Sequence, residues 1–577
     1  MLETLCVRNV VVGSGCAGLN AADVLSALGE DVVLLTEDML SGTSRNTGSD
    51  KQTYYKLSLS GDEGDSVGEM ARDLWYQDTN GDTALCEAAG SVPCFMKLAA
   101  LGVPFPTNAY GEYVGYRTDH DPRMRATSAG PLTSRMMTEA LEASVMAKHV
   151  QVLQGLAARI VTGDQGVEAL DVWDGKAGRF YRIRCANVIL CTGGPAHVYL
   201  ERVYPESQHG MSGLALACGA EGANLHCWQY GLASLAFRWN LSGSYQQVVP
   251  RYVSVGDDGE EREFLREHLG DEQLWYLTFL KGYQWPFDPE KVPGSSEIDL
   301  LVKHEKDLGR RVYLDYRRNP SGFSFERLPK EAADYLTNSG AAGSTPYARL
   351  QAMNAPAIQL YLDHGIDLEK EMLEIGVCAQ HHNGGIAVDS HWQSSVTGLY
   401  VCGEAAGTFG RKRPGGSALN STQVGSQRAA RHCHVNGRQV QEAVSPWTPM
   451  VLPRHADMGQ VEAFQREMTR VAGIERDRGG MEMLSGEVLR QIGAMGEIHE
   501  CGEEDILERL LFRDILWTQR AVLSAMLKSE EETEPGQGIM ITREGTSTRV
   551  AARPMPQRDL WFERVWKRYR EEQEMIQ

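Results

Sequence analysis

Residues 10–18 read Val-Val-Val-Gly-Ser-Gly-Cys-Ala-Gly, and this stretch decides the fold. The three valines predict a buried strand, and the glycines form a G-x-G-x-x-G turn that opens a helix reaching about Gly29. A second apolar strand follows at residues 32–35. A strand, a glycine-rich turn, a helix and a further strand make up the βαβ unit that binds dinucleotides. The sequence therefore predicts a redox cofactor at this turn.

The glycines of the turn each have a physical reason. Gly13 allows the tight turn, Gly15 lets the backbone approach a pyrophosphate, and Gly18 lets the helix pack close to the strand. The helix N-terminus then offers free N–H groups and a partial positive charge to the phosphates. We therefore expect the whole turn to contact the cofactor, namely Gly13, Ser14, Gly15, Cys16, Ala17 and Gly18.

The end of the second strand indicates which dinucleotide is bound. In NAD-binding units an Asp or Glu in this region holds a ribose. Here Thr36 stands in the ribose-facing place and Glu37 follows it. Because this departure weakens an NAD interpretation more than an FAD interpretation, we expect FAD, with Thr36 and Glu37 near its ribose.

The composition limits the classes of protein to be considered. A chain of 577 residues predicts two or three domains. A net charge of −20 argues against nucleic acid and anionic membranes as partners. No apolar run approaches the roughly 18 residues that span a bilayer, and the first strand begins too early to leave room for a signal peptide. The twelve cysteines include no C-x-x-C pair, so we expect buried free thiols and a cytoplasmic location.

The strand and helix pattern occurs in two separated parts of the chain. Residues 5–225 alternate strands, glycine turns and helices, and the pattern returns at residues 399–430. The region between them is less regular and rich in aromatic residues, and residues after 453 are mostly helical in pattern. We therefore predict an α/β protein with three parts. They are a Rossmann-like domain at the dinucleotide site (residues 1–225 and 375–440), an inserted α+β domain (226–374) and a helical C-terminal domain (441–577).

Four segments in a fixed order carry a resemblance to a known family. They are the N-terminal glycine motif, Cys-Thr-Gly-Gly at 191–194, Asn-Gly-Gly-Ile at 383–386, and residues 398–419. The last segment contains Gly-Leu-Tyr-Val-Cys-Gly-Glu-Ala-Ala-Gly and then Arg-Pro-Gly-Gly-Ser-Ala-Leu. The chain resembles the flavoprotein subunits of succinate dehydrogenase and fumarate reductase, together with L-aspartate oxidase. The resemblance covers most of the chain and implies the FAD fold of that family. It implies an FAD-binding domain at residues 1–225 and 375–440, and a capping domain at 226–374 that closes over the flavin and holds the substrate.

The resemblance also implies roles for individual residues. Glu404 would accept hydrogen bonds from ribityl or ribose hydroxyls. Gly416 would open the last helix of the FAD domain, whose N-terminal amides would stabilise the reduced flavin. No histidine lies near residues 45–49, where some members attach FAD covalently, so we expect non-covalent FAD. The other implied contacts are Ser44, Thr47, Gly48, Ser49, Ala158, Thr192, Gly193, Gly194, Ser212, Gly403, Ser417 and Leu419.

The segments that hold the substrate in this family are changed here. The family reduces a C=C bond next to a carboxylate, or runs the reverse reaction, with hydride passing through flavin N5. The segment at Gln229 lacks the family's histidine, Gln380 replaces a second histidine, and Ser295 and Ser296 stand where an arginine–aspartate pair would move the proton. Each lost charge-assisted bond removes about 1.5–3 kcal/mol. We therefore expect a larger, flatter or less charged substrate than fumarate, succinate or aspartate.

One substrate arginine is retained. Arg413 matches the arginine of the R-x-G-G motif, where a guanidinium binds a carboxylate or polarises a carbonyl by paired hydrogen bonds. Adjacent histidines on a strand point to opposite faces, so only one of a neighbouring pair can reach a shared site. The further candidates are Tyr230, Arg251, Arg311 and His381 for proton transfer, and Gln229, Gln380 and His382 for substrate binding.

Metal binding is not expected. His432, Cys433 and His434 lie together on a helix end, but no fourth ligand is near them in the sequence. A structural zinc site needs four such ligands.

Three functions are consistent with the sequence. The first is an FAD-dependent oxidoreductase that transfers hydride between flavin N5 and the α,β-carbons of an unsaturated acid or carbonyl compound. The second is an amino-acid or amine oxidase of the L-aspartate oxidase type. The third is a flavin-bearing subunit of a multi-protein electron-transfer complex. Because the chain has no iron–sulfur or haem motif, we expect an external electron donor, which is a partner protein, reduced flavin or a nicotinamide. A homo-oligomer is left open.

Overall fold

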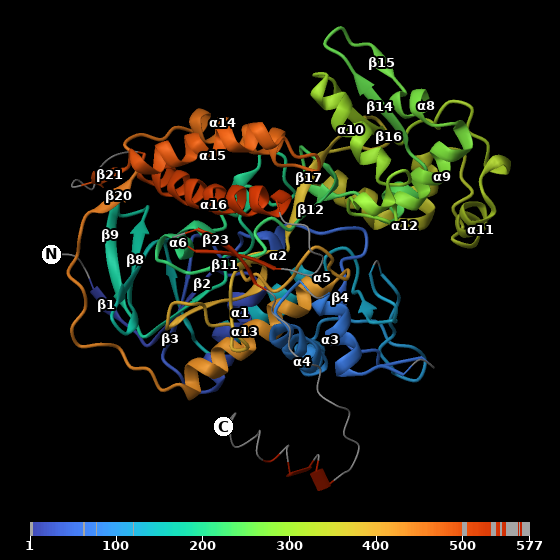
Figure 1. Ribbon diagram of the computed structural model, residues 1–577. Helices are drawn as coiled ribbons and strands as arrows, with labels where there is room; N and C mark the ends of the chain where they lie inside the picture. Colours follow the sequence, from blue (N-terminus) through green and yellow to red (C-terminus); the bar gives the residue numbers. More distant parts are fainter. Residues whose placement is uncertain are drawn as a thin grey trace.

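In the computed structural model (Figure 1), the structure describes residues 4–61, 64–76, 78–118, 120–498, 505–531, 538–542, 545–549, 563, 564, 566, 567 and 570. The first βαβ unit consists of β2 (Asn9–Val12), α1 (Cys16–Ala27) and β3 (Val32–Thr36). Gly13 joins β2 to α1 at φ 108°, which L side chains rarely adopt. A Cβ atom at Gly18 would lie 1.8 Å from the carbonyl oxygen of Gly13. Only glycine therefore lets the helix start this close to the strand.

A parallel sheet brings distant parts of the chain together. Its strand order is β19–β10–β2–β3–β6, with β6 (Gln151–Gln154), β10 (Asn187–Leu190) and β19 (Leu399–Val401) joining the first unit. In register, Val12 pairs with Leu190, and Leu190 pairs with Val401. Helix α13 (Ser417–Val435) packs against α1, although nearly four hundred residues separate them (Figure 1). All the carboxyl ends of these parallel strands meet at one edge of the sheet.

Further elements complete this part of the molecule. A second sheet has the order β1–β9–β8–β7, and a third sheet has the order β18–β11–β22–β23. The strands concerned are β1 (Thr4–Cys6), β7 (Leu156–Gly163), β8 (Gly166–Asp174), β9 (Arg179–Arg184), β11 (Gly222–Ala223), β18 (Gly385–Ile386), β22 (Gly538–Ile541) and β23 (Thr546–Arg549). Short pairs are formed by β4 (Tyr54–Tyr55) with β5 (Ala126–Thr127) and by β20 (Met450–Leu452) with β21 (Gly496–Ile498). The helices are α2 (Thr43–Asn46), α3 (Val67–Trp75), α4 (Gly81–Ala100), α5 (Thr133–Ala147) and α6 (Ser212–Ala217).

The inserted region has a sheet and a hydrophobic core of its own. The sheet is antiparallel, with the order β13–β12–β17–β16–β14–β15. Its strands are β12 (Trp228–Ser234), β13 (Trp239–Asn240), β14 (Arg251–Val255), β15 (Glu261–Arg262), β16 (Arg311–Asp315) and β17 (Leu373–His382). Its helices are α7 (Ser244–Gln247), α8 (Phe264–His268), α9 (Asp271–Lys281), α10 (Glu297–Asp307), α11 (Lys330–Asn338) and α12 (Pro346–Asp363). Trp239, Tyr245, Tyr252 and Trp275 are buried in this core, so most of the aromatic residues of the insert serve packing.

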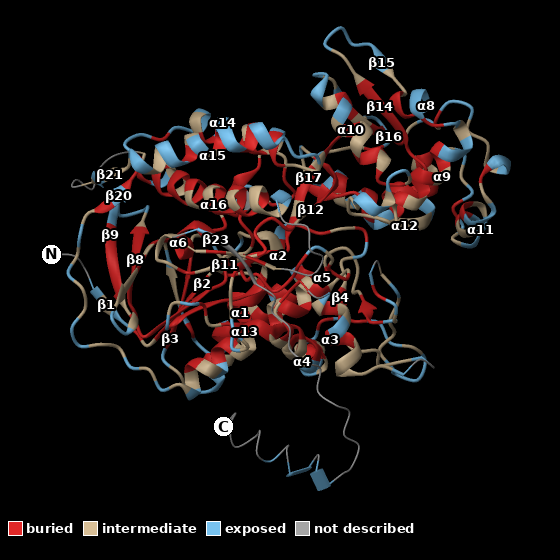
Figure 2. Cartoon of the chain, viewed as in Figure 1, coloured by how far each residue is buried: buried red, intermediate tan, exposed pale blue. Residues whose placement is uncertain are grey.

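Three long helices near the C-terminus cover the FAD-binding part. They are α14 (Met458–Val471), α15 (Arg478–Gly493) and α16 (Ile506–Glu531), and Figure 2 shows exposed residues on the outer face of α14 and α15. Their buried residues, such as Phe464 and Leu516, belong to the same cluster as Val11 of the central sheet. The helices are therefore continuous with the main core, and the boundaries that we gave to the three domains stay predictions.

Among the residues that the structure describes, no helix is long and apolar enough to cross a membrane. Eleven cysteines fall within the described part of the chain, and all of them are free.

Candidate active site

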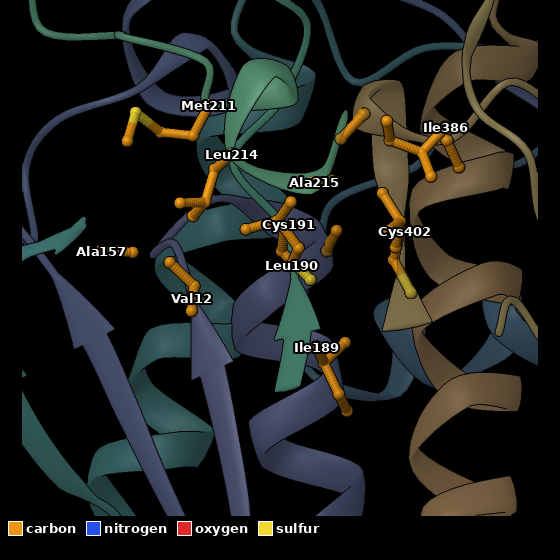
Figure 3. Packing of buried hydrophobic residues seen from close by; sticks show 14 of the residues in the cluster. Val12, Ala157, Ile189, Leu190, Cys191, Met211, Leu214, Ala215, Ile386 and Cys402 are labelled. Carbon is orange, nitrogen blue, oxygen red and sulfur yellow. The ribbon is translucent and has the colours of Figure 1, made fainter. Parts of the chain in front are cut away.

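A cavity of about 490 Å³ lies at the carboxyl edge of the parallel sheet. Val12, Leu35, Cys191 and Cys402 line it where β2, β3, β10 and β19 end. Figure 3 shows Val12, Cys191 and Cys402 beside one another at these strand ends. Because ligands of open α/β sheets bind outside the carboxyl ends of the strands, the sheet places this cavity where a dinucleotide is expected.

The N-terminus of α1 forms one wall of the cavity. The helix begins after Gly15, which has no side chain to cap it. A Cβ atom at Gly15 would lie 3.2 Å from Oγ of Ser44, and the Cys16 amide donates to that oxygen at 3.3 Å. An uncapped helix N-terminus in a glycine-rich turn attracts phosphate. This wall therefore fits the pyrophosphate of FAD.

The end of β3 carries the polar groups next to that turn. Oγ of Ser14 and Oγ1 of Thr36 lie 2.9 Å apart. Glu37 lines the cavity, and its carboxylate accepts from Nδ1 of His209 at 2.8 Å. His209 thereby fixes the orientation of Glu37 at the place where a ribose would bind.

The N-terminus of α13 forms a second uncapped wall. Gly416 precedes the helix at φ 89°, and a Cβ atom there would lie 2.5 Å from the side chain of Thr53. Oγ of Ser417 turns back to the carbonyl of Pro414 at 2.8 Å. Two uncapped helix N-termini thus face one elongated cavity, which fits a ligand with phosphates at one end and a reducible ring at the other.

Glu404 is held between two donors. Its Oε1 accepts from the Tyr204 hydroxyl and from the His382 backbone amide, the latter at 2.8 Å. Burial raises the pKa of this carboxyl group. Because Glu404 lines the cavity next to Gly403, it can still offer its remaining acceptor capacity to a ligand hydroxyl.

A buried cation lies on the wall that faces the inserted region. Arg413 is 8% exposed, and burial lowers its pKa to about 10. Its Nε and Nη2 both donate to Oε1 of Gln229, at 3.1 and 2.6 Å. Among the described residues, no carboxylate forms a direct ion pair with it, although Glu404 and Glu87 act on its charge from further away. The guanidinium is therefore not neutralised by a contacting acid.

The alternation of β17 separates its two histidines. His381 lines the cavity, and its Nδ1 lies 3.0 Å from Oδ1 of Asn383. His382 points away, with Nε2 3.1 Å from the carbonyl of Leu225 and its ring stacked on Trp228 at 4.2 Å. Burial lowers the pKa of both imidazoles. His381 alone of the pair can contact a ligand in this cavity.

The inserted region closes the opposite side. The Tyr335 hydroxyl donates to Oε1 of Gln247 at 3.1 Å, and Nε1 of Trp285 donates to the carbonyl of Leu232 at 3.2 Å. On this side the cavity is lined by Tyr335, Trp285, Gln247, Tyr283 and Pro286. This side is mostly aromatic and carries no charged group among these five.

The cavity brings together most of the residues expected from the sequence. Those that line it are Gly13, Ser14, Gly15, Cys16, Ala17, Thr36, Glu37, Ser44, Thr47, Gly48, Ser49, Thr192, Gly193, Gly403, Glu404, Gly416, Leu419, Arg413, Gln229, Gln380 and His381.

Other expected residues are described by the structure but do not line the cavity. In the FAD part these are Gly18, Ala158, Gly194, Ser212 and Ser417. The carbonyl of Ala158 accepts from Arg513, and its neighbour Ala157 lines the cavity instead. Met211 likewise lines it in place of Ser212. These shifts by one residue follow from backbone direction, which sequence patterns do not give.

Three of the candidates for proton transfer lie elsewhere. The Tyr230 hydroxyl donates to the carbonyl of Ala472 and contacts the Tyr199 hydroxyl. Arg251 is paired with Glu263 at 2.8 Å and Asp315 at 3.3 Å within the inserted sheet. Arg311 is 65% exposed and paired with Glu374. We do not keep these three as catalytic candidates, and the same applies to His382 as a substrate ligand.

Several cavity residues were not predicted. They come from loops and from the inserted region, namely Asp50, Gln208, His209, Gln247, Tyr283, Trp285 and Tyr335. No local motif marks them, because the tertiary structure alone brings their loops to the sheet edge. Among the described residues, no cluster of three or more His, Cys, Asp or Glu side chains is arranged to hold a metal ion.

Comparison with known families agrees with this geometry. A family model described as "FAD binding domain" matches residues 9–419. The chain belongs to this family. It is an FAD-dependent oxidoreductase, and the two uncapped helix termini fit its cofactor.

Relatives of this flavoprotein share low sequence identity over most of its length. L-aspartate oxidase of Caulobacter vibrioides is 25% identical and aligns over 83% of this chain and 85% of that protein. L-aspartate oxidase of Streptomyces coelicolor is 24% identical and aligns over 90% of this chain and 86% of that protein.

Solved structures of the same fold include two large flavoproteins. FrdA of E. coli quinol fumarate reductase superposes with a TM-score of 0.68 at 16% identity, over 97% of this chain and 99% of that chain. Sdh1 of Mycobacterium smegmatis superposes with a TM-score of 0.70 at 17% identity, over 96% of each chain. The flavoprotein therefore has the fold of succinate dehydrogenase and fumarate reductase flavoproteins.

Proposed function

We propose that this flavoprotein transfers hydride between FAD and the α,β-carbons of an unsaturated acid or carbonyl compound. The observation that carries the proposal is Arg413, a buried guanidinium that lines the cavity and forms no direct ion pair with a carboxylate among the described residues, although Glu404 and Glu87 act on its charge from further away. A substrate carboxylate or carbonyl oxygen would complete its hydrogen bonds. The positive charge would then draw electron density toward that oxygen, which activates the adjacent C=C bond.

FAD, when bound, supplies the hydride donor or acceptor of the reaction. The turn at residues 13–17 would hold its pyrophosphate, and Thr36 and Glu37 its ribose. The N-terminus of α13, at Gly416 and Leu419, would lie against the flavin. We propose that FAD is held without a covalent bond, since residues 45–49 include no histidine.

Side chains of the protein would bind and orient the substrate. Arg413 binds and orients the substrate oxygen, and Gln229 holds the guanidinium in place. Tyr283, Trp285 and Tyr335 line the cavity from the inserted region and would place aromatic surface against the substrate. This mostly aromatic side favours a flat, weakly charged substrate over a C4 dicarboxylate.

A second candidate is an amino-acid oxidase. It is favoured by the curated relatives, which are L-aspartate oxidases. We also propose an external electron partner, which is a protein, reduced flavin or a nicotinamide, because the sequence contains no motif for a further redox centre. The free cysteines support a reducing compartment and hence the cytoplasm.

Anaerobic titration tests these proposals. The holoprotein is reduced with dithionite, and cinnamate, cinnamamide or methyl cinnamate is added while flavin absorbance is followed. Reoxidation by one of these compounds supports the first function. Bleaching of the oxidised flavin by amino acids, without reoxidation by any unsaturated compound, would instead establish the second. Acid precipitation should leave all the flavin in the supernatant if it is bound without a covalent bond.

A further inference from the structure

Two hydrogen-bond acceptors on the cavity wall lack a protein partner. Nε2 of His381 and Oε1 of Gln380 are buried and make no hydrogen bond with the described residues. Both residues line the cavity, and His381 is only 6% exposed. Since a buried polar atom without a partner destabilises the protein, an unpaired acceptor on this wall indicates a ligand that completes its hydrogen bond, and His381 is the more buried of the two residues.

The surroundings of Asn383 fix the proton on His381. Nδ2 of Asn383 donates to the carbonyl of Gly410 at 2.8 Å, so its amide oxygen must face His381. That oxygen lies 3.0 Å from Nδ1 of His381 and can only accept. Nδ1 therefore carries the proton, and Nε2 of the neutral ring is an acceptor.

His381 stays neutral in this environment. Burial and the nearby charge of Arg413 hold the pKa of its imidazole well below the usual range. Neutral imidazole donates through one nitrogen and accepts through the other. The ring of this cavity-lining residue therefore keeps an unpaired acceptor nitrogen at neutral pH.

Arg413 supplies the complementary donor close by. Its Cζ lies 5.8 Å from the ring centroid of Phe409, and the imidazole of His381 lies 6.2 Å from the same ring. The charge of Arg413 also acts on the imidazole of His381, so the same wall offers a cationic donor and a neutral acceptor. A ligand that only accepts hydrogen bonds would satisfy Arg413 and leave Nε2 of His381 unpaired.

We propose that this wall binds a molecule with two groups, an acceptor oxygen for Arg413 and an N–H or O–H donor for Nε2 of His381. Asn383 is the positioning residue that keeps Nε2 unprotonated. The inference rests on the proposed function, because the acceptor oxygen is the carbonyl or carboxylate assigned there to Arg413. Amides, hydroxy acids and amino acids carry both groups, whereas esters and simple carboxylates carry acceptors alone.

Binding of matched pairs to the oxidised holoprotein tests the proposal by calorimetry. The first pair is cinnamamide and methyl cinnamate, and the second is 3-phenyllactate and 3-phenylpropanoate. In each pair only the first compound has a donor next to its carbonyl or carboxylate group. We expect the donor-bearing compound to bind about tenfold more tightly in at least one pair, the factor that one buried hydrogen bond supplies. Equal affinities within both pairs, or no binding of either donor-bearing compound, would overturn the proposal.

Variants then test which residues cause the higher affinity for the donor-bearing compounds. His381→Phe removes the acceptor and Asn383→Leu releases the ring, so both should reduce the affinity ratio toward one. A merely structural defect would weaken both members of a pair alike and leave the ratio unchanged. His226→Phe is the matched control, since His226 is a buried histidine outside the cavity, and it should keep the ratio. Retention of the ratio in His381→Phe would assign the donor contact to another residue and refute the inference.

The outcome is separable from the proposed function. The affinity ratio is measured without hydride transfer, so it can hold even if no unsaturated compound reoxidises the flavin. Conversely, reoxidation by an unsaturated compound without any affinity ratio would leave the proposed function standing and remove this inference.

Discussion

Oε1 of Gln229 accepts two hydrogen bonds from Arg413, one from Nε at 3.1 Å and one from Nη2 at 2.6 Å. Gln229 lies on β12 and Arg413 in the loop before α13, so the contact joins segments 184 residues apart. A neutral amide orients the guanidinium without cancelling its charge. A ligand oxygen in this buried place therefore meets a positive charge that water screens only weakly.

Arg413→Met should lower kcat/KM for an unsaturated acid by about 100-fold, because a charge-assisted hydrogen bond contributes roughly 1.5–3 kcal/mol. FAD content should stay at the wild-type level. The control is Arg411→Met, two residues away, whose side chain is exposed and outside the cavity. Steady-state kinetics and the ratio of flavin to protein absorbance measure both effects. Equal losses in the two variants would contradict a specific role for Arg413.

Gly13→Ala should abolish FAD binding. A Cβ atom there would lie 2.4 Å from the carbonyl oxygen of Cys191, and Gly13 adopts φ 108°. The backbone must therefore move away from the position that approaches the pyrophosphate. Gly29→Ala is the matched control, since Gly29 follows the same helix at φ 76° with no atom within 4 Å of the added Cβ. Purified Gly13→Ala should be colourless while Gly29→Ala stays yellow, and a yellow Gly13→Ala protein would count against the site.

Glu87 should make stability fall as pH rises. This residue of α4 is buried, its Oε1 accepts from Ser421 at 2.7 Å, and its Oε2 has no partner among the described residues. Burial raises its pKa to about 8 from an ordinary value of 4.5. The folded state therefore binds a proton that the unfolded state has released between these two pH values. The stability that the protonated Glu87 carboxyl group gives the folded state is fully present below pH 4.5 and is lost as pH approaches 8.

Glu87→Gln should remove this dependence. One pKa unit corresponds to about 1.4 kcal/mol. The free energy of unfolding of the variant minus that of wild type should therefore increase by a few kcal/mol between pH 5 and pH 8. Urea unfolding at several pH values measures the difference. Glu139→Gln, at an exposed position on α5, should show the same dependence of unfolding free energy on pH as wild type. A Glu87→Gln curve with that same dependence would show that Glu87 ionises normally.

Asn354→Ala should loosen the inserted region from the FAD part. Nδ2 of Asn354, at a kink in α12, donates to Oδ1 of Asp50 at 2.6 Å, and the Ser244 hydroxyl donates to the same oxygen. Loss of a hydrogen bond to a charged group costs roughly 1.5–3 kcal/mol. We expect KM to rise about tenfold with little change in FAD affinity, together with faster proteolysis of the inserted region. Gln359→Ala, on the exposed face of the same helix, is the control. An unchanged KM in Asn354→Ala would show that this contact does not hold the cavity closed.

The sequence predicted the parts of the fold that depend on local patterns. The valines at 10–12 and the glycines at 13, 15 and 18 were sufficient for the first βαβ unit, because burial periodicity and backbone conformation are local properties. The alternation of β17 likewise predicted that only one of His381 and His382 reaches the cavity. The resemblance to flavoproteins then indicated that β19 and α13 complete the same domain.

Proton-transfer candidates could not be chosen in this way. Arg251 and Arg311 have suitable chemistry, yet their charges are used in ion pairs with Asp315 and Glu374. His209 and Asp50 carry no sequence signal, although both line the cavity. Whether a charged side chain is paired or free depends on residues brought near it by the fold, and no local pattern contains that information.

The sequence by itself determined that two separated segments build one dinucleotide site, since glycine spacing and strand periodicity set the backbone there, and its resemblance to a flavoprotein family implied that FAD is the ligand. The tertiary structure alone decided which side chains face the ligand. It kept Arg413 out of a direct ion pair, left Nε2 of His381 without a partner among the described residues, and brought aromatic residues of the insert to the same cavity. The physical reason is that charge, tautomer and access are set by neighbours in space, and these neighbours are hundreds of residues apart along the chain.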